Sequence, residues 1–253
     1  MVGVISSALV ALAATPPAPS PPPSARPVVY IQAGHQAPME PGYRAQTGAT
    51  GGPFGTEERF NVRVSAAVEA DLRSAGVDAI HTPGKVSPYR APGAAFVSIH
   101  FDQAHGAASI GYAVYDPPKN HNYYYHGQGA GSPSSVRYPD SAPQRPATKV
   151  TAAVMAQSHA LADAMSGRFR VIFAPRNGAH SRFLGVQHGA NGNLRMQFYY
   201  GYRRTNTAAR VIIECGTAGA DNRFLAHVDL IAGAIASGII DYLRATHQLP
   251  PPA

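Results

Sequence analysis

Three apolar segments of the chain end on residues that can bind a metal ion or exchange a proton. The segments are VVYIQAGH, which ends at His35, FVSIH, which ends at His100, and VIIE, which ends at Glu214. Short apolar runs of this kind are typical of buried strands. In a sheet of parallel strands, functional groups collect at the carboxyl edge. We therefore expect these three side chains to lie close together.

A fourth residue, Glu57, begins the helix expected after the loop that follows His35, so the chain returns it to the same edge. Two imidazoles and a carboxylate are the ligand set of an open catalytic zinc site, in which water takes the fourth position. Zinc lowers the pKa of water from about 15.7 toward ~7, so Glu214 would suffice as the base at neutral pH. The alternative is chance, because the chain has 11 histidines. The coincidence of four groups favours a site.

Alternating strands and helices are expected to position these groups. Phe60, Val64, Val68 and Leu72 recur at helical spacing after Thr56, a residue type suited to a helix N-cap. Strands are predicted over 28–33, 76–82, 94–100, 110–116 and 209–216, and helices over 57–75, over 148–167 and from Asp221 as N-cap onward. This order indicates one α/β domain, with a twisted, mostly parallel or mixed sheet covered by helices on both faces.

The chain is expected to divide into three parts. Residues 1–27 start with an apolar stretch similar to the core of a secretory signal and continue as a Pro-rich spacer. No Lys or Arg precedes Arg26, so the charged start of such a signal is missing. Residues 28–247 would form the folded domain and residues 248–253 a Pro-rich tail. The first part favours export.

The chain is basic, with a formal net charge of +7 and a pI of about 9.7. A coding bias toward Arg would explain this charge, and so would attraction to an anionic polymer such as nucleic acid, a lipid surface or cell wall. No run of Arg interleaved with aromatic residues occurs, which argues against nucleic acid. No apolar stretch reaches the ~20 residues of a membrane span, so no stable membrane insertion is expected.

Cys215 is the only cysteine, which excludes a disulfide within the chain. Its position beside Glu214 raises the possibility of a nucleophile, yet no base is positioned for it by the sequence. A cysteine at the end of a strand is more often a small buried hydrophobic residue.

Four motifs occur in an order that resembles the zinc-dependent N-acetylmuramoyl-L-alanine amidases of the amidase_3 type, which hydrolyse peptidoglycan. The motifs are VVYIQAGHQ, EERFNVRVSAAVEADLRSAGVDA, AAFVSIHFD and VIIECGTAGADNRFLAHVDLIAGAIASGIIDYL. Each motif alone is weak, but their order is specific, and the resemblance covers residues 28–244. It implies hydrolysis of the amide that joins N-acetylmuramic acid to the L-alanine of the stem peptide.

The resemblance also implies roles for individual residues. His35, Glu57 and His100 would bind one Zn2+ per chain, and Glu214 would be the catalytic carboxylate. Glu58 competes with Glu57, but only the phase that starts at Glu57 matches the helical positions of the family.

Three further positions bear on the site. Arg204, ten residues before the catalytic carboxylate as in the family, would contact a substrate carboxylate or tie down its own loop. Gln32 stands where the family usually has Asp, and we expect it to change how His35 is oriented. Asp102 replaces part of the usual Ala-Asn pair and would orient His100 or contact substrate.

The segment 117–147, rich in Tyr, Gly, Ser and Pro, matches nothing in the family, and it would cover the substrate groove or pack on itself. His121 and His126 in this segment are expected to be exposed or packing residues, and His180 and His188 are spare site candidates. Besides a secreted cell-wall or periplasmic amidase, or a phage-encoded lysin, two alternatives stay open. These are a zinc peptidase acting on stem peptides and an inactive wall-binding domain.

Overall fold

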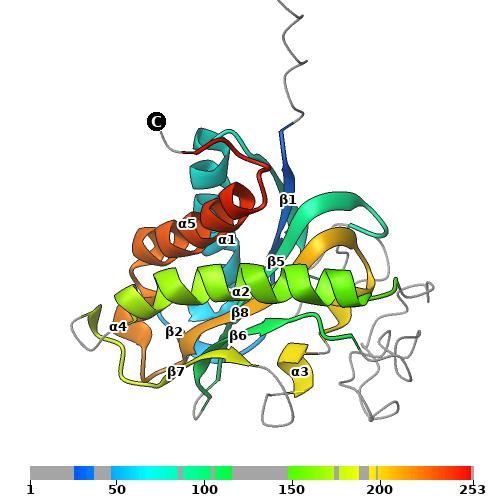
Figure 1. Cartoon of the computed structure of the whole chain (residues 1–253). Helices are drawn as coiled ribbons and strands as arrows, with labels where there is room; N and C mark the ends of the chain where they lie inside the picture. The colour runs from blue at the N-terminus through cyan, green and yellow to red at the C-terminus, as the bar shows by residue number, and fades with distance from the viewer. Residues whose placement is uncertain are drawn as a thin grey trace, which may run out of the picture.

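A six-stranded mixed sheet forms the centre of the protein (Figure 1). The computed structural model describes residues 26–36, 47–84, 88–103, 106–115, 148–173, 177–187, 194–197 and 199–251. The strands are β1 (Val28–Ala33), β4 (Asp78–Pro83), β5 (Pro92–Asp102), β6 (Ala108–Tyr112), β7 (Phe183–Gln187) and β8 (Asn206–Thr217). Their order across the sheet is β4-β1-β5-β8-β6-β7. Neighbouring strands are parallel except β6 and β8, which are antiparallel.

Helices and a small hairpin complete the described part. The helices are α1 (Glu57–Ser74), α2 (Ala152–Ile172), α3 (Leu194–Gln197), η4 (Tyr200–Arg203), α4 (Asn222–Leu225) and α5 (Val228–Ala245). Strands β2 (Thr50–Gly52) and β3 (Gly55–Thr56) pair with each other ahead of α1. This arrangement confirms the predicted single α/β domain with a mixed sheet.

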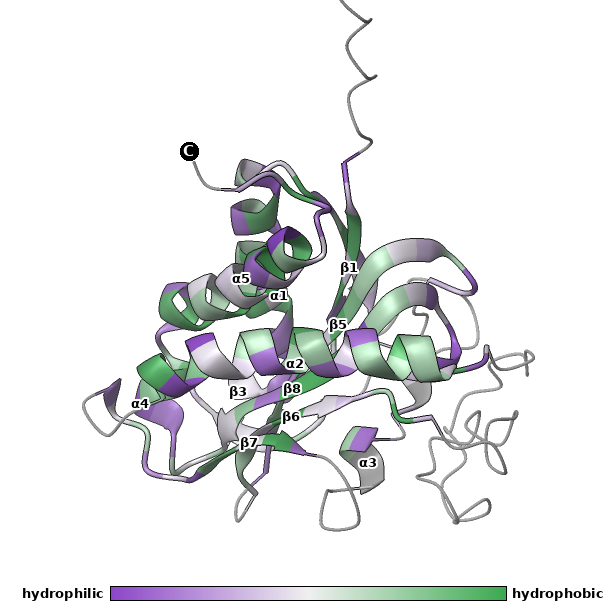
Figure 2. Ribbon diagram, in the orientation of Figure 1, coloured by the Kyte–Doolittle hydropathy of each residue, from purple (hydrophilic) through white to green (hydrophobic). Residues whose placement is uncertain are grey.

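The two faces of the sheet are covered differently. Side chains alternate between the faces along a strand, so Val97 and Ile99 lie on the face opposite Phe96. Val97 and Ile99 belong to the larger core cluster, which also holds the buried residues of the long helices α1, α2 and α5. Phe96 packs in a smaller cluster with residues of α3 and η4. Figure 2 shows green and purple segments along α2 and α5, as expected for helices with one buried side.

Helix α1 forms as the sequence predicted. Thr56 has an extended backbone, and its side chain accepts a hydrogen bond from the amide of Arg59, which confirms it as the N-cap. The predicted apolar stripe of this helix is fully buried. The cap therefore fixes the first residue of α1, Glu57, at the carboxyl edge of the sheet, where β1 also ends.

The end of the chain differs from the prediction. One helix was expected to continue from Asp221, but α4 ends at Leu225 and α5 starts at Val228. The Asp221 side chain makes no capping hydrogen bond to α4. It is fully buried and accepts hydrogen bonds from the amides of His180, Ser181 and Thr217 and from the Ser181 hydroxyl. Asp221 therefore joins the segment before β7 to the end of β8.

Replacing Asp221 by alanine is expected to lower the free energy of unfolding by about 2–4 kcal/mol, because it leaves buried amides without acceptors. Asp241→Ala is the matched control. Asp241 forms an ion pair on the surface with Arg168, and such pairs contribute about 1 kcal/mol or less. Urea unfolding of both variants measures the difference, and equal losses would contradict the role of Asp221.

Several predictions concern residues outside the described ones. These are the signal-like part of 1–27, the whole 117–147 segment with His121 and His126, and His188. The proposed limits of the folded domain stay predictions. Among the described residues, no helix combines the length and the apolar character that crossing a membrane requires.

Candidate metal centre

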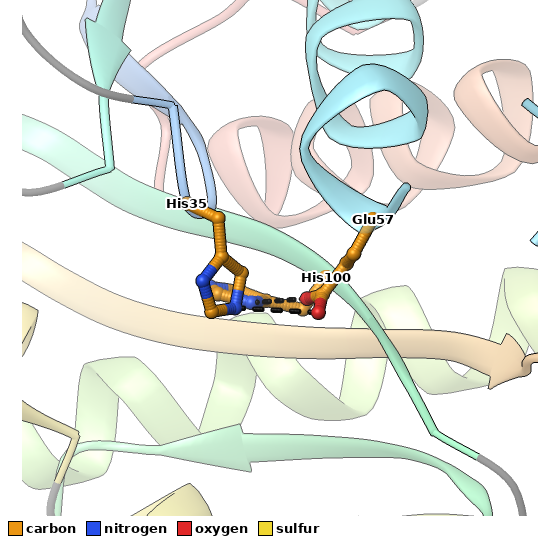
Figure 3. A group of neighbouring side chains, drawn as sticks. All are labelled: His35, Glu57 and His100. Atoms are coloured by element: carbon orange, nitrogen blue, oxygen red, sulfur yellow. Dashed lines mark hydrogen bonds and ion pairs between the residues drawn. The ribbon is translucent and has the colours of Figure 1, made fainter. Parts of the chain in front are cut away.

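His35, Glu57 and His100 converge on one point at the carboxyl edge of the sheet (Figure 3). Each offers one ligand atom, and these atoms all lie within 4.8 Å of one another. His35 Nε2 lies 3.3 Å from Glu57 Oε2, and His100 Nδ1 lies 2.7 Å from Glu57 Oε1. The structure therefore brings together the three residues predicted as metal ligands. Glu57, and not Glu58, is the carboxylate of this group.

Each side chain reaches the group from a different element. His35 follows β1 in a turn and has a backbone φ of 62°, a left-handed conformation that few residues other than Gly adopt. Glu57 is the first residue of α1, and His100 lies near the end of β5. The side chains of Glu57 and His100 are buried, with 5% and 8% of their surface exposed, whereas that of His35 is 28% exposed. The group thus opens to solvent on the His35 side.

Two hydrogen bonds hold the Glu57 carboxylate in place. The backbone amide of Ala49 donates to Oε2 at 2.8 Å, and the Asn61 side chain donates to Oε1 at 3.5 Å. The same Asn61 nitrogen donates to the carbonyl of Gly34 at 2.9 Å. One amide therefore connects the carboxylate to the turn that carries His35.

The protonation states in the group suit a metal ligand set. Burial alone would raise the pKa of Glu57, but the contacts of its carboxylate with the His100 and His35 rings hold this pKa well below its usual value. Burial lowers the pKa of His100. An ionised carboxylate and a neutral imidazole are the forms that bind metal ions.

The geometry also fits zinc. Two ligand atoms bound at about 2.05 Å to a tetrahedral zinc lie roughly 3.3 Å apart, as His35 Nε2 and Glu57 Oε2 do. Two glycines leave the room that the ligands occupy. A Cβ added to Gly34 would lie 2.3 Å from the His100 ring, and one added to Gly48 would lie 2.3 Å from Glu57 Oε2. The residues present can therefore hold a metal ion.

Gly34→Ala is expected to weaken zinc binding by at least about tenfold, because the new methyl group must displace the His100 ring. Gly167→Ala is the control. Gly167 lies within α2, and an added Cβ there meets no atom within 4 Å, so zinc binding should be unchanged. Zinc titration by calorimetry compares the two. Wild-type affinity in Gly34→Ala would show that the close approach does not matter.

Glu214 lies beside the group. It is the register partner of His100 on the neighbouring parallel strand β8, so both side chains lie on the same face of the sheet. Its Oε2 atom is buried and has no hydrogen-bond partner among the described residues. Burial, and then the negative charges of Glu57 and Asp102, raise the pKa of Glu214 well above its usual value. A buried carboxylate oxygen without a partner is costly, and this one is next to a candidate metal site.

Arg204 lies away from this group. It precedes β8, whose first residue pairs with Pro92 at the amino end of β5. The eight steps along the strand from Asn206 to Glu214 span roughly 26 Å at ~3.3 Å per residue. The expected contact between Arg204 and a substrate held beside Glu214 is therefore unsupported. The Arg204 carbonyl accepts a hydrogen bond from the Arg90 amide, and a role of the Arg204 side chain in its own loop stays a prediction.

Gln32 and Asp102 have described contacts that differ from those expected of them, and their predicted orienting roles stay predictions. Gln32 was expected to act on His35 and Asp102 on His100. Instead, Gln32 Oε1 accepts hydrogen bonds from Ser98 and Tyr199, and these two hydroxyls face His100 Nε2. Asp102 accepts a hydrogen bond from the amide of Gln103, and its charge raises the pKa of both His100 and Glu214.

The remaining candidates have no place in the group. Cys215 is buried, and burial raises the pKa of its thiol well above the usual value, which favours the reading as a small hydrophobic residue. His180 is exposed and donates its backbone amide to Asp221. Tyr199 was missed by the sequence analysis, although its ring packs against His100 with centroids 5.7 Å apart. Tyr199 does not come at the end of an apolar run, so no sequence pattern indicated that it belongs to the site.

No protein-family model and no curated protein matches the sequence. Solved structures do. An N-acetylmuramoyl-L-alanine amidase from Clostridium difficile 630 aligns with a TM-score of 0.53 at 13% identity, over 87% of this chain and 98% of that one. The N-acetylmuramoyl-L-alanine amidase AmiC2 of Nostoc punctiforme aligns with a TM-score of 0.52 at 20% identity, over 88% of this chain and 99% of that one. The N-acetylmuramyl-L-alanine amidase Ami1 from Mycobacterium smegmatis aligns with a TM-score of 0.50 at 15% identity, over 88% of this chain and 99% of that one.

At these identities the alignments establish the fold. The chain has the fold of solved N-acetylmuramoyl-L-alanine amidases, which confirms the fold that the four motifs implied.

Proposed function

We propose that the protein is a zinc-dependent N-acetylmuramoyl-L-alanine amidase. It hydrolyses the amide bond between N-acetylmuramic acid and the L-alanine of the peptidoglycan stem peptide. The convergence of His35, Glu57 and His100 within 4.8 Å carries this proposal. The position of Glu214 on the adjacent strand and the amidase fold support it.

His35, Glu57 and His100 hold the zinc ion in this proposal. When bound, zinc acidifies water and polarises the scissile carbonyl. With three protein ligands, a bound zinc ion would have room for water or substrate, as in catalytic zinc sites. The more exposed side of the group, at His35, is where substrate enters.

Glu214 is the general base and then the general acid. Its carboxylate takes a proton from the attacking water as the new C–O bond forms. It returns this proton to the nitrogen of L-alanine as the C–N bond breaks.

We also propose that the protein acts after export, at the cell wall or in the periplasm, with a phage-encoded lysin as the alternative source. The formal charge of +7 favours contact with an anionic wall polymer. The apolar start of the chain supports export.

Digestion of purified peptidoglycan tests the proposed reaction. The zinc-loaded protein is expected to release intact stem peptides that carry a new amino terminus on L-alanine, and a chelator should stop the release. Peptides cut internally would instead identify a zinc peptidase. Sedimentation with the wall without release of any peptide would identify a binding domain. Either of these results would overturn the amidase assignment.

A further inference from the structure

The ring of His100 is held on the side away from Glu57 by neutral polar groups. His100 Nε2 lies 3.1 Å from Ser98 Oγ and 3.4 Å from Tyr199 Oη. Both hydroxyls lie 2.7 Å from Gln32 Oε1. Gln32 and Ser98 are completely buried. These groups come from three separate segments: β1, β5 and the residue before η4.

The contact between Gln32 and Pro83 determines which atom donates in each hydrogen bond between Gln32, Ser98, Tyr199 and His100. The Gln32 side-chain nitrogen faces the carbonyl of Pro83 at 3.4 Å, and a carbonyl can only accept. The Gln32 oxygen is therefore the atom that faces the two hydroxyls. Each hydroxyl has a single proton and lies 2.7 Å from this oxygen, so each donates its proton there and faces His100 with an oxygen that can accept.

His100 Nε2 must therefore carry a proton and donate it to Ser98, with Tyr199 beside it. The lone pair of Nδ1 is then directed to the Glu57 side of the ring, where Oε1 lies 2.7 Å away, so both atoms can bind the same cation. We infer that Gln32, Ser98 and Tyr199 select Nδ1 as the metal-binding nitrogen of His100. This inference rests on the proposed metal centre. The three residues are positioning residues, since their polar groups face the far side of the ring.

The network ends on an amide, whereas carboxylates often serve as partners of metal-bound histidines. Gln32 is fixed by Pro83 on one side and by two hydroxyls on the other. It thus orients the ring without adding a negative charge to a site that already holds Glu57 and Glu214. Tyr199 also helps to orient the His100 ring by packing, because the two rings meet nearly edge to face at 79°.

Zinc titration and NMR of the ring nitrogens test this inference in the full chain, with zinc alone as the ligand. In the wild-type protein, Nδ1 is expected to bind zinc, and the Nε2 proton is expected to exchange slowly with water. Ser98→Ala removes the nearest acceptor and should weaken zinc binding by about 10–100-fold and speed this exchange. Tyr199→Phe keeps the ring and removes only the hydroxyl, so it should show the same changes to a smaller extent.

Tyr242→Phe is the matched control, because the Tyr242 hydroxyl donates to Gln157 on α2, away from the site. Coordination through Nε2, or wild-type affinity and exchange in both site variants, would overturn the inference. The proposed function would still stand if the wild type bound zinc and released stem peptides. Zinc binding without hydrolysis would overturn only the proposed function. A wild-type chain that does not bind zinc would overturn both.

Discussion

Glu214→Gln is expected to lower the rate of stem-peptide release by about 10²–10⁴-fold, the contribution of a general acid–base group, while zinc binding is retained. The amide has nearly the shape of the carboxylate but cannot take a proton from water. Because Glu214 is outside the group of three ligands, its loss leaves all of them in place. Peptide release from purified peptidoglycan and the zinc content of the same sample measure the two effects.

Glu58→Gln is the control for this variant. Glu58 is next to the ligand Glu57 but is outside the metal-binding group, so the change should leave activity near the wild-type value. An active Glu214→Gln enzyme would exclude Glu214 as the base. A variant without zinc would instead show that Glu214 helps to hold the metal.

The Glu214→Gln variant should also be more stable than the wild type when no metal is bound. The pKa of Glu214 is raised in the folded protein, so the unfolded chain releases this proton at a lower pH than the folded chain does. Stability therefore falls as the pH rises from the unfolded pKa to the folded one. Glutamine has no proton to release, so the metal-free variant should have a higher Tm at neutral pH and little advantage at pH values below the unfolded pKa.

His35→Ala is expected to lose both zinc and activity. His35 is the most exposed of the three ligands, so its removal should disturb the core least. Zinc at 1,000 times its Kd should stabilise the wild-type fold by about 4 kcal/mol, because it binds only the folded chain. This stabilisation should be absent in the variant. Thermal unfolding with and without zinc, and with a chelator, measures it.

His180→Ala is the matched control for the loss of a histidine. His180 is exposed, and its only described hydrogen bond uses the backbone amide, which alanine retains. This variant should respond to zinc as the wild type does. A zinc response that survives in His35→Ala would remove His35 from the ligand set.

Much of the site could be predicted from the sequence because its groups lie where apolar patterns end. β1 and β5 are nearly continuous apolar runs, and each leads directly to a histidine. The apolar stripe of α1 separated Glu57 from Glu58, since only one of two adjacent residues can lie on the side that faces the sheet edge.

Other parts of the fold could not be predicted because their positions depend on tertiary contacts. Phe224 and Val228 are four residues apart, as in a continuous helix, yet the chain turns between them. The short helix before this turn starts after Asp221, whose side chain accepts hydrogen bonds from the amides of His180 and Ser181, about forty residues earlier. Tyr199 approaches His100 through packing that no local pattern encodes. Strand β7 is short and contains Gly185, so its sequence shows no clear alternation.

The alternation along β5 divides the mutational tolerance of the protein between two independent sets of positions. Val97 and Ile99 point toward the long helices, whereas Ser98 and His100 point toward the opposite side. An engineer seeking greater heat resistance can therefore vary the first set, with volume conserved, without altering the chemistry of the second. Adjacent codons in this strand should accordingly experience different selection, one for packing volume and the next for functional-group identity.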